Sequence, residues 1–337
     1  MATAVARRHV LRNMLHFLLG FAVPLTLLCW VENRWDIAVL AALANWLVIV
    51  VVWNSLELLL SGLKPPKTDV KVSKLYMLYA ILSIAALAST AIFGVESVWA
   101  VYGVGMSMGV IGVLGGRWTL STISIEVIPY LAIAYAIAAI WFTPPMTQLL
   151  PLALCLVAAY NAARRHGLDV LVVLGLTAYY VALLAVGGAQ LTVPVASTSV
   201  YSYSVLPWVV AVFIFYLIVG ICEEMSSRAL WWHVGIATAV VFVLLHIPSR
   251  FYGLLVPSIQ QDAGIADVAS MLTLYISAML YLVVPTALLT MVAVKHGLLS
   301  AILFHAAFDT MVSIPVELSI AILLGLGALY TLYTKRR

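Results

Sequence analysis

Ionisable side chains interrupt otherwise apolar sequence at three places in the last third of this 337-residue chain. The three motifs read GICEEMSSR at 220–228, FVLLH at 242–246 and HAAFD at 305–309. Placing one charged side chain at the centre of a membrane-spanning helix costs about 2.5–3.5 kcal/mol, so such residues mark functional sites by default. The candidate site residues are therefore Glu223, Glu224, Arg228, His246, His305 and Asp309.

The spacing within the motifs indicates which side chains share a helix face. Residues four apart lie on one face of an α-helix, so Glu224 can pair with Arg228. The same rule places His305 beside Asp309. Glu223 points about 100° away from Glu224 and can meet another partner. Two adjacent carboxylates in apolar sequence repel each other and lose hydration, which is costly without a use. A structural Glu224–Arg228 pair and packing roles for single histidines stay open as alternatives.

These residue types are suited to the hydrolysis of a peptide bond. The reaction needs a base that activates water and a donor that stabilises the developing oxyanion. A carboxylate and two imidazoles supply both. The set of Glu223, His246 and His305 is also a ligand combination of catalytic zinc, with water in the fourth position. The sequence leaves a metal-free, glutamate-dependent site and a zinc site open, and we favour the metal-free version.

The composition indicates what surrounds these motifs. Hydrophobic residues make up 65% of the chain and charged residues only 9%, whereas a soluble domain carries about 25% charged residues. Membrane lipid must therefore cover most of the outside, and the long apolar runs select helices over a barrel. The sequence predicts an all-α, polytopic transmembrane helix bundle. The net charge of +4 then reflects basic loops and not a surface that binds nucleic acid.

About twelve apolar segments are candidates to cross a hydrocarbon layer of about 30 Å. They are 14–31, 37–61, 75–93, 98–115, 124–143, 146–163, 169–189, 205–227, 233–248, 271–293, 298–312 and 316–333. With the N-terminus in the cytoplasm and the segments alternating, all Lys and Arg residues except Arg34 and Arg250 fall on the cytoplasmic side. This asymmetry obeys the positive-inside rule. It predicts an integral multi-pass cell membrane protein with cytoplasmic N- and C-termini.

The motifs divide the chain into two predicted parts. Residues 1–204 form N-terminal transmembrane helices to which the sequence assigns no role, and residues 205–334 hold all three motifs. At about 1.5 Å per residue, each motif falls in the half of the membrane nearest the basic residues Arg228 and Lys295. We therefore expect the motifs to meet in one polar site near the cytoplasmic face.

In this order the motifs resemble those of the CPBP family, which comprises the type II CAAX prenyl proteases and bacteriocin-processing or immunity proteins. The resemblance rests on Glu223-Glu224-x-x-x-Arg228, Phe242-x-x-x-His246 and His305-x-x-x-Asp309. It covers roughly residues 205–312, about a third of the chain. The resemblance implies a CPBP-like helical core in the C-terminal third and the activity of an intramembrane protease.

The resemblance also implies a role for each residue. Glu223 and His246 would bind and activate the attacking water. Glu224 would assist or orient, tied to Arg228, which would be structural. His305 would stabilise the oxyanion together with the residue at position 309.

The aspartate at position 309 departs from the version of the motif that has asparagine there. An amide donates a hydrogen bond to an oxyanion, whereas an ionised carboxylate repels it. Asp309 therefore fits the site as a protonated donor, as a partner that orients His305, or as a residue that serves a metal.

Three functions remain in competition. The favoured one is an endopeptidase that hydrolyses a peptide bond near the cytoplasmic face, with a CAAX-type, lipid-modified or other membrane-tethered peptide as its substrate. An ion-coupled transporter would relay ions through the Glu/His cluster, but it would spread polar residues over more spans and show repeat symmetry. A non-catalytic membrane scaffold or immunity factor would keep its function after Glu223→Gln. The sequence predicts no oligomeric state.

Overall fold

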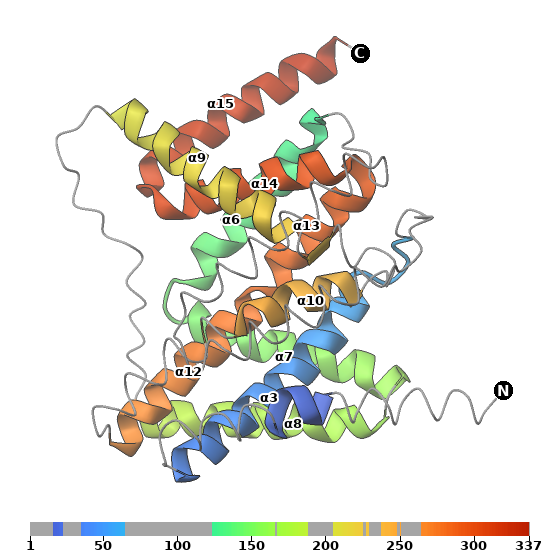
Figure 1. Ribbon diagram of the computed structural model, residues 1–337, viewed down its shortest axis with the longest axis vertical. Helices are drawn as coiled ribbons and strands as arrows, with labels where there is room; N and C mark the ends of the chain where they lie inside the picture. Colours follow the sequence, from blue (N-terminus) through green and yellow to red (C-terminus); the bar gives the residue numbers. More distant parts are fainter. Residues whose placement is uncertain are drawn as a thin grey trace.

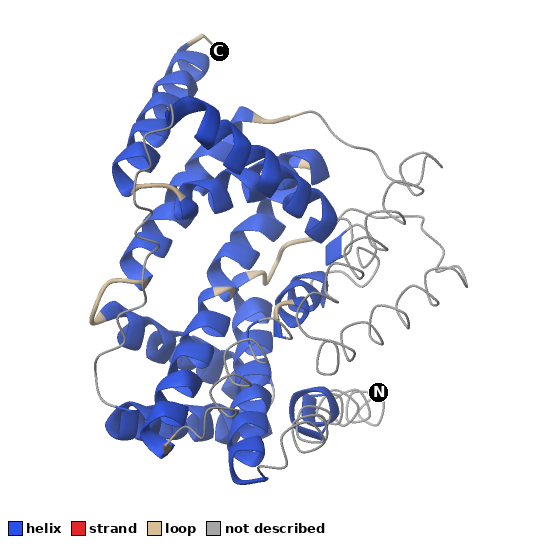
Figure 2. Ribbon diagram, turned by 60° about the vertical axis from the view of Figure 1, so that its left-hand side comes forward, coloured by secondary structure: helices blue, strands red, loops and turns tan. Residues whose placement is uncertain are grey.

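The computed structural model describes an all-helical chain. The described residues are 16–22, 35–64, 123–165, 167–187, 205–224, 227–228, 237–247, 250 and 264–336. Within these ranges 91% of the residues are helical and none lies in a strand (Figure 2). The predicted all-α class is therefore confirmed.

Several of the helices have the length and composition of membrane spans. The elements are η1 (Leu18–Ala22), α3 (Trp35–Leu59), η3 (Ile125–Val127), α6 (Ile128–Trp141), α7 (Met146–Arg165), α8 (Gly167–Gly187), α9 (Val205–Glu224), α10 (Ala237–Leu245), α12 (Ile265–Tyr281), α13 (Val283–His296), α14 (Leu298–Ser313) and α15 (Val316–Lys335). Among the described residues, six stretches are long and apolar enough to cross a membrane: α3, α7, α8, most of α9, α12 with α13, and α15. The chain is thus consistent with a multi-pass membrane protein.

Two predicted segments have different bounds from the helices found in the structure. The run predicted at 271–293 is longer and consists of α12 and α13, which meet at Leu282. Of the run predicted at 233–248, the described residues form α10, which is about 14 Å long. Segments 75–93 and 98–115, and most of 14–31, lie outside the described residues. The count of twelve is therefore not confirmed.

Helices gather at two opposite ends of the molecule, and α6 of the N-terminal part packs with the C-terminal helices α13, α14 and α15. α9, α14 and α15 lie at one end, α3, α7 and α8 at the other, and α12 followed by α13 runs between them (Figure 1). α9 and α14 pack closely and antiparallel. A Cβ added at Gly220 of α9 would lie 3.2 Å from the Ile302 carbonyl oxygen and 3.5 Å from His305 Cβ. Farther along, Tyr216 and Ser313 share a hydroxyl hydrogen bond of 2.7 Å. The last turn of α9 is thus held against the middle of α14.

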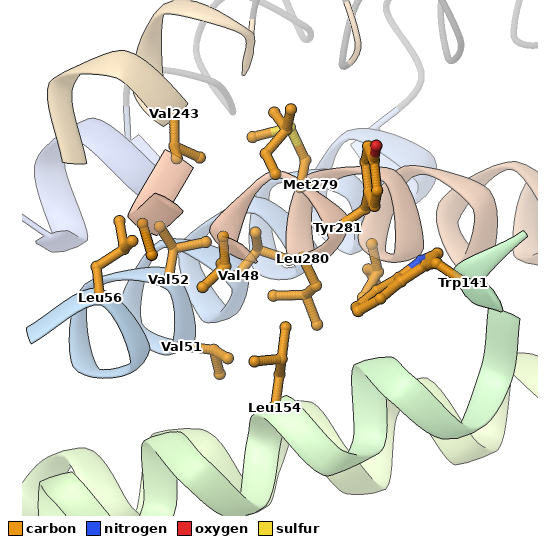
Figure 3. Close-up of a cluster of buried hydrophobic side chains, with 14 of the residues drawn as sticks. Val48, Val51, Val52, Leu56, Trp141, Leu154, Val243, Met279, Leu280 and Tyr281 are labelled. Carbon is orange, nitrogen blue, oxygen red and sulfur yellow. The ribbon is translucent and has the colours of Figure 1, made fainter. Parts of the chain in front are cut away.

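One hydrophobic core contains residues from both predicted parts of the chain. Val51 of α3 and Leu154 of α7 face Leu280 of α12, and Val243 of α10 borders the same cluster (Figure 3). Close packing of these buried side chains fixes the short α10 against the longer helices around it. The division into 1–204 and 205–334 stays a prediction, because residues 188–204 lie outside the described ranges.

Candidate active site

All six candidate residues lie in described segments and approach one another. They are Glu223 and Glu224 at the end of α9, Arg228 one turn later, His246 directly after α10, and His305 and Asp309 on α14. The expected convergence of the three motifs is therefore confirmed.

A buried ion pair, Glu224 with Arg228, forms what we call the inner end of the site. Arg228 Nη1 donates to Glu224 Oε1 over 2.5 Å, and both side chains are 0% exposed. The guanidinium also lies over the Phe242 ring, with Cζ 4.5 Å from the centroid, and its Nη2 donates to Thr290 Oγ1 at 3.5 Å. These contacts compensate a charge that has lost its hydration. The predicted pairing of Glu224 with Arg228 is present.

The imidazole of His305 is surrounded by carboxylates. Its Nδ1 lies 3.0 Å from Glu224 Oε1. Its Nε2 lies 3.3 Å from Asp309 Oδ2 and 3.5 Å from Glu223 Oε2. Because carboxylate oxygens accept hydrogen bonds, both ring nitrogens of His305 face groups to which they can donate. The ring is thereby fixed in position, and the predicted contact between His305 and Asp309 is present.

The backbone fixes the orientation of His246. Its Nδ1 lies 2.8 Å from the carbonyl oxygen of Phe242, one turn earlier. A carbonyl only accepts, so the proton of the neutral ring sits on Nδ1 and a lone pair is left on Nε2. This Nε2 faces Glu223 Oε2 at 3.5 Å. Two acceptor atoms that face each other need a hydrogen between them, which a bound water can supply. The pair can therefore hold a water and take a proton from it.

The two adjacent glutamates have different surroundings. Glu224 is held by a guanidinium and by His305 Nδ1. Glu223 instead places Oε2 within 3.5 Å of the Nε2 atoms of both histidines. Its backbone carbonyl also accepts a hydrogen bond of 2.6 Å from the Ser227 hydroxyl, which continues the helical turn. One carboxylate is thus fixed by a permanent charge, and the other faces groups that can exchange protons.

The donor types at the centre of the site fit zinc. Glu223 Oε2 is 3.5 Å from Nε2 of His246 and from Nε2 of His305, and ligands of a tetrahedral zinc stand about 3.3 Å apart when the bonds are about 2.0–2.1 Å. Across the described ranges, however, no three His, Cys, Asp or Glu side chains are arranged, as they stand, to hold a metal ion. The chemistry of the donors fits a metal, whereas their present arrangement does not enclose one.

Two supporting residues received no role from the sequence. Phe242 belongs to the second motif, and it serves the site three times: its ring faces Arg228, its carbonyl holds His246, and its ring centroid is 5.6 Å from that of His305. Thr290 of α13 contacts Arg228 from a helix without a motif. The signal for Thr290 was its four-residue spacing from Thr286 in an apolar run, which gives α13 a narrow polar face.

Comparison of the chain with family models, with curated proteins and with solved structures finds no match. The resemblance to the CPBP family therefore rests on the three motifs alone. What the chain does must be inferred from the geometry of these side chains.

Proposed function

We propose that the chain is an intramembrane endopeptidase of the CPBP type. The observation that supports this most strongly is the position of Glu223 Oε2, 3.5 Å from the Nε2 atoms of His246 and His305. A buried carboxylate between two imidazoles can accept a proton from water and pass it on, which is the core of peptide-bond hydrolysis. Glu224, Arg228 and the other motif residues then hold this arrangement in place.

Glu223 and His246 activate the attacking water. A water bound between Glu223 Oε2 and His246 Nε2 gives up a proton to this pair while its oxygen forms a bond with the scissile carbonyl carbon. The carbonyl π electrons move onto the carbonyl oxygen. The accepted proton is later delivered to the amide nitrogen as the C–N bond breaks, so that an acid and an amine leave. General-base assistance of this kind contributes roughly 10²–10⁴-fold.

His305 stabilises the oxyanion. Its Nε2 lies 3.5 Å from Glu223 Oε2, beside the position proposed for the attacking water. From there it can donate a hydrogen bond to the negative charge that develops on the carbonyl oxygen of the substrate. Glu224, at 3.0 Å from Nδ1, keeps the ring from turning. Asp309, at 3.3 Å from Nε2, orients the ring or, when protonated, donates to the oxyanion beside it.

The proposed orientation has both termini in the cytoplasm and the site in the cytoplasmic half of the membrane. It follows from the distribution of Lys and Arg between the predicted loops. The proposed substrates are CAAX-type, lipid-modified or other membrane-tethered peptides. A zinc ion, where bound by Glu223, His246 and His305, would polarise the scissile carbonyl as a Lewis acid.

The test is a cleavage assay with the purified full-length chain. Farnesylated CAAX-type peptides and unmodified peptides of the same sequence are incubated with it in lipid vesicles, with and without a chelator, and products are identified by mass spectrometry. Cleavage that survives the chelator supports the metal-free site, and cleavage that zinc restores supports the metal site. Proton or cation flux across the vesicles without any cleavage would favour the transporter instead.

A further inference from the structure

We infer that Gly220 is a positioning residue of the proposed site: because it has no side chain, α14 approaches α9 closely enough for His305 to contact both glutamates of α9. This inference rests on the proposed function and deepens it, because it assigns a further residue to the same site. Gly220 begins the stretch at 220–228, but neither its spacing nor the family resemblance gave it a role. It acts through its neighbours and touches no reacting atom.

Gly220 lies on the face of α9 that meets α14. Tyr216, Gly220 and Glu224 follow one another at four-residue spacing and therefore share one face of the helix. Tyr216 shares its hydroxyl hydrogen bond of 2.7 Å with Ser313 of α14. Glu224 Oε1 lies 3.0 Å from Nδ1 of His305 on the same helix. Gly220 is buried between these two contacts, so it lies within the interface of the two helices.

A side chain at position 220 does not fit unless α14 moves. A Cβ added at Gly220 would lie 3.2 Å from the Ile302 carbonyl oxygen, 3.5 Å from His305 Cβ and 3.6 Å from the Ala306 backbone nitrogen. The shortest of these contacts requires the neighbouring atom to give way by a few tenths of an ångström. Backbone atoms of a helix are fixed by its hydrogen bonds and cannot turn aside as the end of a flexible side chain can. The helix α14 must therefore shift as a whole.

The contacts of His305 are sensitive to such a shift because they cross the interface between α9 and α14. Its Nδ1 lies 3.0 Å from Glu224 Oε1, and its Nε2 lies 3.5 Å from Glu223 Oε2. Glu224 cannot follow a moving α14, because its fully buried ion pair with Arg228 holds it at the inner end of the site. Reacting groups must be held within about 0.5 Å of the productive geometry. A displaced α14 therefore weakens the proposed oxyanion donor.

Two other helical glycines provide matched controls. A Cβ at Gly327 of α15 would meet no atom of the described residues within 4 Å. At Gly175 of α8 it would meet only Leu47 Cδ2, at the ordinary contact distance of 4.0 Å. Replacement of glycine by alanine favours the helix at all three positions. An effect that appears only at Gly220 therefore comes from the separation of α9 and α14.

Magnetic resonance tests the positioning of His305 without any cleavage. The full chain is labelled with ¹⁵N-histidine in vesicles, and the His305 signals are identified by their loss in His305→Gln. The proton resonance of Nδ1–H moves to lower field as its hydrogen bond to Glu224 shortens. Gly220→Ala is expected to move this resonance to higher field, whereas Gly175→Ala and Gly327→Ala leave it in place. An unchanged resonance in Gly220→Ala overturns the inference.

Steady-state kinetics on a peptide that the wild-type chain cleaves form the second arm. A displacement of about 1 Å can cost about 10²-fold in rate, so kcat is expected to fall about 10-fold in Gly220→Ala and about 10²-fold in Gly220→Val. KM should stay unchanged, because His305 acts on the developing charge and not on the bound peptide. Gly327→Ala should match the wild type.

The outcomes separate a positioning role from a structural one. An unchanged kcat in Gly220→Ala overturns the inference while leaving the proposed protease intact. A Gly220→Ala chain that does not fold, judged by its thermal unfolding, also overturns it, because the glycine would then serve the fold and not the site. Gly220→Ala alone decides if Gly220→Val does not fold. If no chain cleaves any peptide, the proposed function fails, whereas the Nδ1–H resonance still decides whether Gly220 positions His305.

Discussion

Two polar clusters lie on different helices of this molecule, and they use carboxylates differently. In the cluster on α3, α7 and α8, Asn54 Nδ2 donates to Asp169 Oδ2 at 3.1 Å. Asn161 Nδ2 donates to Glu57 Oε2 at 3.3 Å, and Arg165 pairs with Glu57 Oε1 at 3.1 Å. In the C-terminal site, by contrast, Glu223 faces two imidazoles. Amides and guanidinium groups give permanent hydrogen bonds, whereas imidazoles can give and accept protons.

The difference separates structural from chemical use of a buried charge. Asp169 is 3% exposed and sits in the first turn of α8, where a carboxylate suits the positive end of the helix dipole. Its amide partner, Asn54, connects α3 to α8. An amide does not exchange protons as an imidazole does, so this contact is structural. Glu223 has no such position at a helix start, because it ends α9. Burial of a carboxylate there is unfavourable for stability, which is expected where the group has a function.

The largest effect on activity is expected from the loss of a histidine next to Glu223. His246→Ala should reduce cleavage by roughly 10²–10⁴-fold, because it removes half of the pair that activates water. The matched variant Asp169→Asn, which changes a buried carboxylate of the other cluster, should leave the cleavage rate unchanged. Turnover is measured on the purified chains in vesicles. A His246→Ala chain with full activity would remove this residue from the mechanism.

The two arginine pairs should differ most in stability. Arg228→Ala leaves Glu224 buried without its charge partner, at a cost of about 3–5 kcal/mol. Arg165→Ala breaks a pair whose side chains are 48% and 26% exposed, so about 0–1 kcal/mol is expected. Thermal unfolding in detergent compares the two. An Arg228→Ala chain that is stable but inactive would give this arginine a direct role in the reaction.

Asp309→Asn should have a smaller effect in the metal-free site. The amide keeps a hydrogen bond at this position and cannot ionise, so most of the activity should remain. In a zinc site that Asp309 tunes through His305, the same change should lower activity by about 10–100-fold. Cleavage by both chains, with and without chelator, distinguishes the cases. Near-complete loss in the variant, together with a wild type that chelator silences and zinc restores, contradicts the metal-free reading.

The smallest effect is expected at Thr290. Its hydroxyl donates to the Thr286 carbonyl oxygen at 2.7 Å and accepts only a long contact of 3.5 Å from Arg228 Nη2, so Thr290→Val should cost about 1 kcal/mol. Thr290→Ser should restore the wild-type melting temperature. A loss as large as that of Arg228→Ala would mean that α13 holds the arginine more firmly than the distance indicates.

Local spacing predicted the pairs within one helix, because the α-helix repeat alone determines which side chains share a face. The contacts of Glu224 with Arg228 and of His305 with Asp309 were predicted in this way. The convergence of the motifs was predicted from the depth of each motif along its segment, at about 1.5 Å per residue from the basic residues Arg228 and Lys295. The catalytic roles of these residues stay predictions.

Contacts that depend on packing could not be read from spacing. The Phe242 ring lies over Arg228 because of the position of α10 in the bundle. Packing in the hydrophobic core holds α10 in this position. The meeting of α12 and α13 at Leu282 lies inside a continuous apolar run, so hydropathy shows no boundary there. Thr290 contacts Arg228 because α13 packs beside the site. Each of these features is a property of the assembled bundle.

We propose that Glu223 carries out the chemistry of the site, whereas the Glu224–Arg228 pair beside it is structural. Glu223→Gln keeps the size of the side chain but replaces one acceptor oxygen by an amide donor and removes the negative charge, so the side chain can no longer take a proton. Cleavage by the purified variant is compared with that by Glu57→Gln, the same change in the other cluster. We predict that Glu223→Gln is folded and loses at least about 10²-fold in turnover, whereas Glu57→Gln is active. Equal turnover in the two variants would contradict a catalytic role of Glu223.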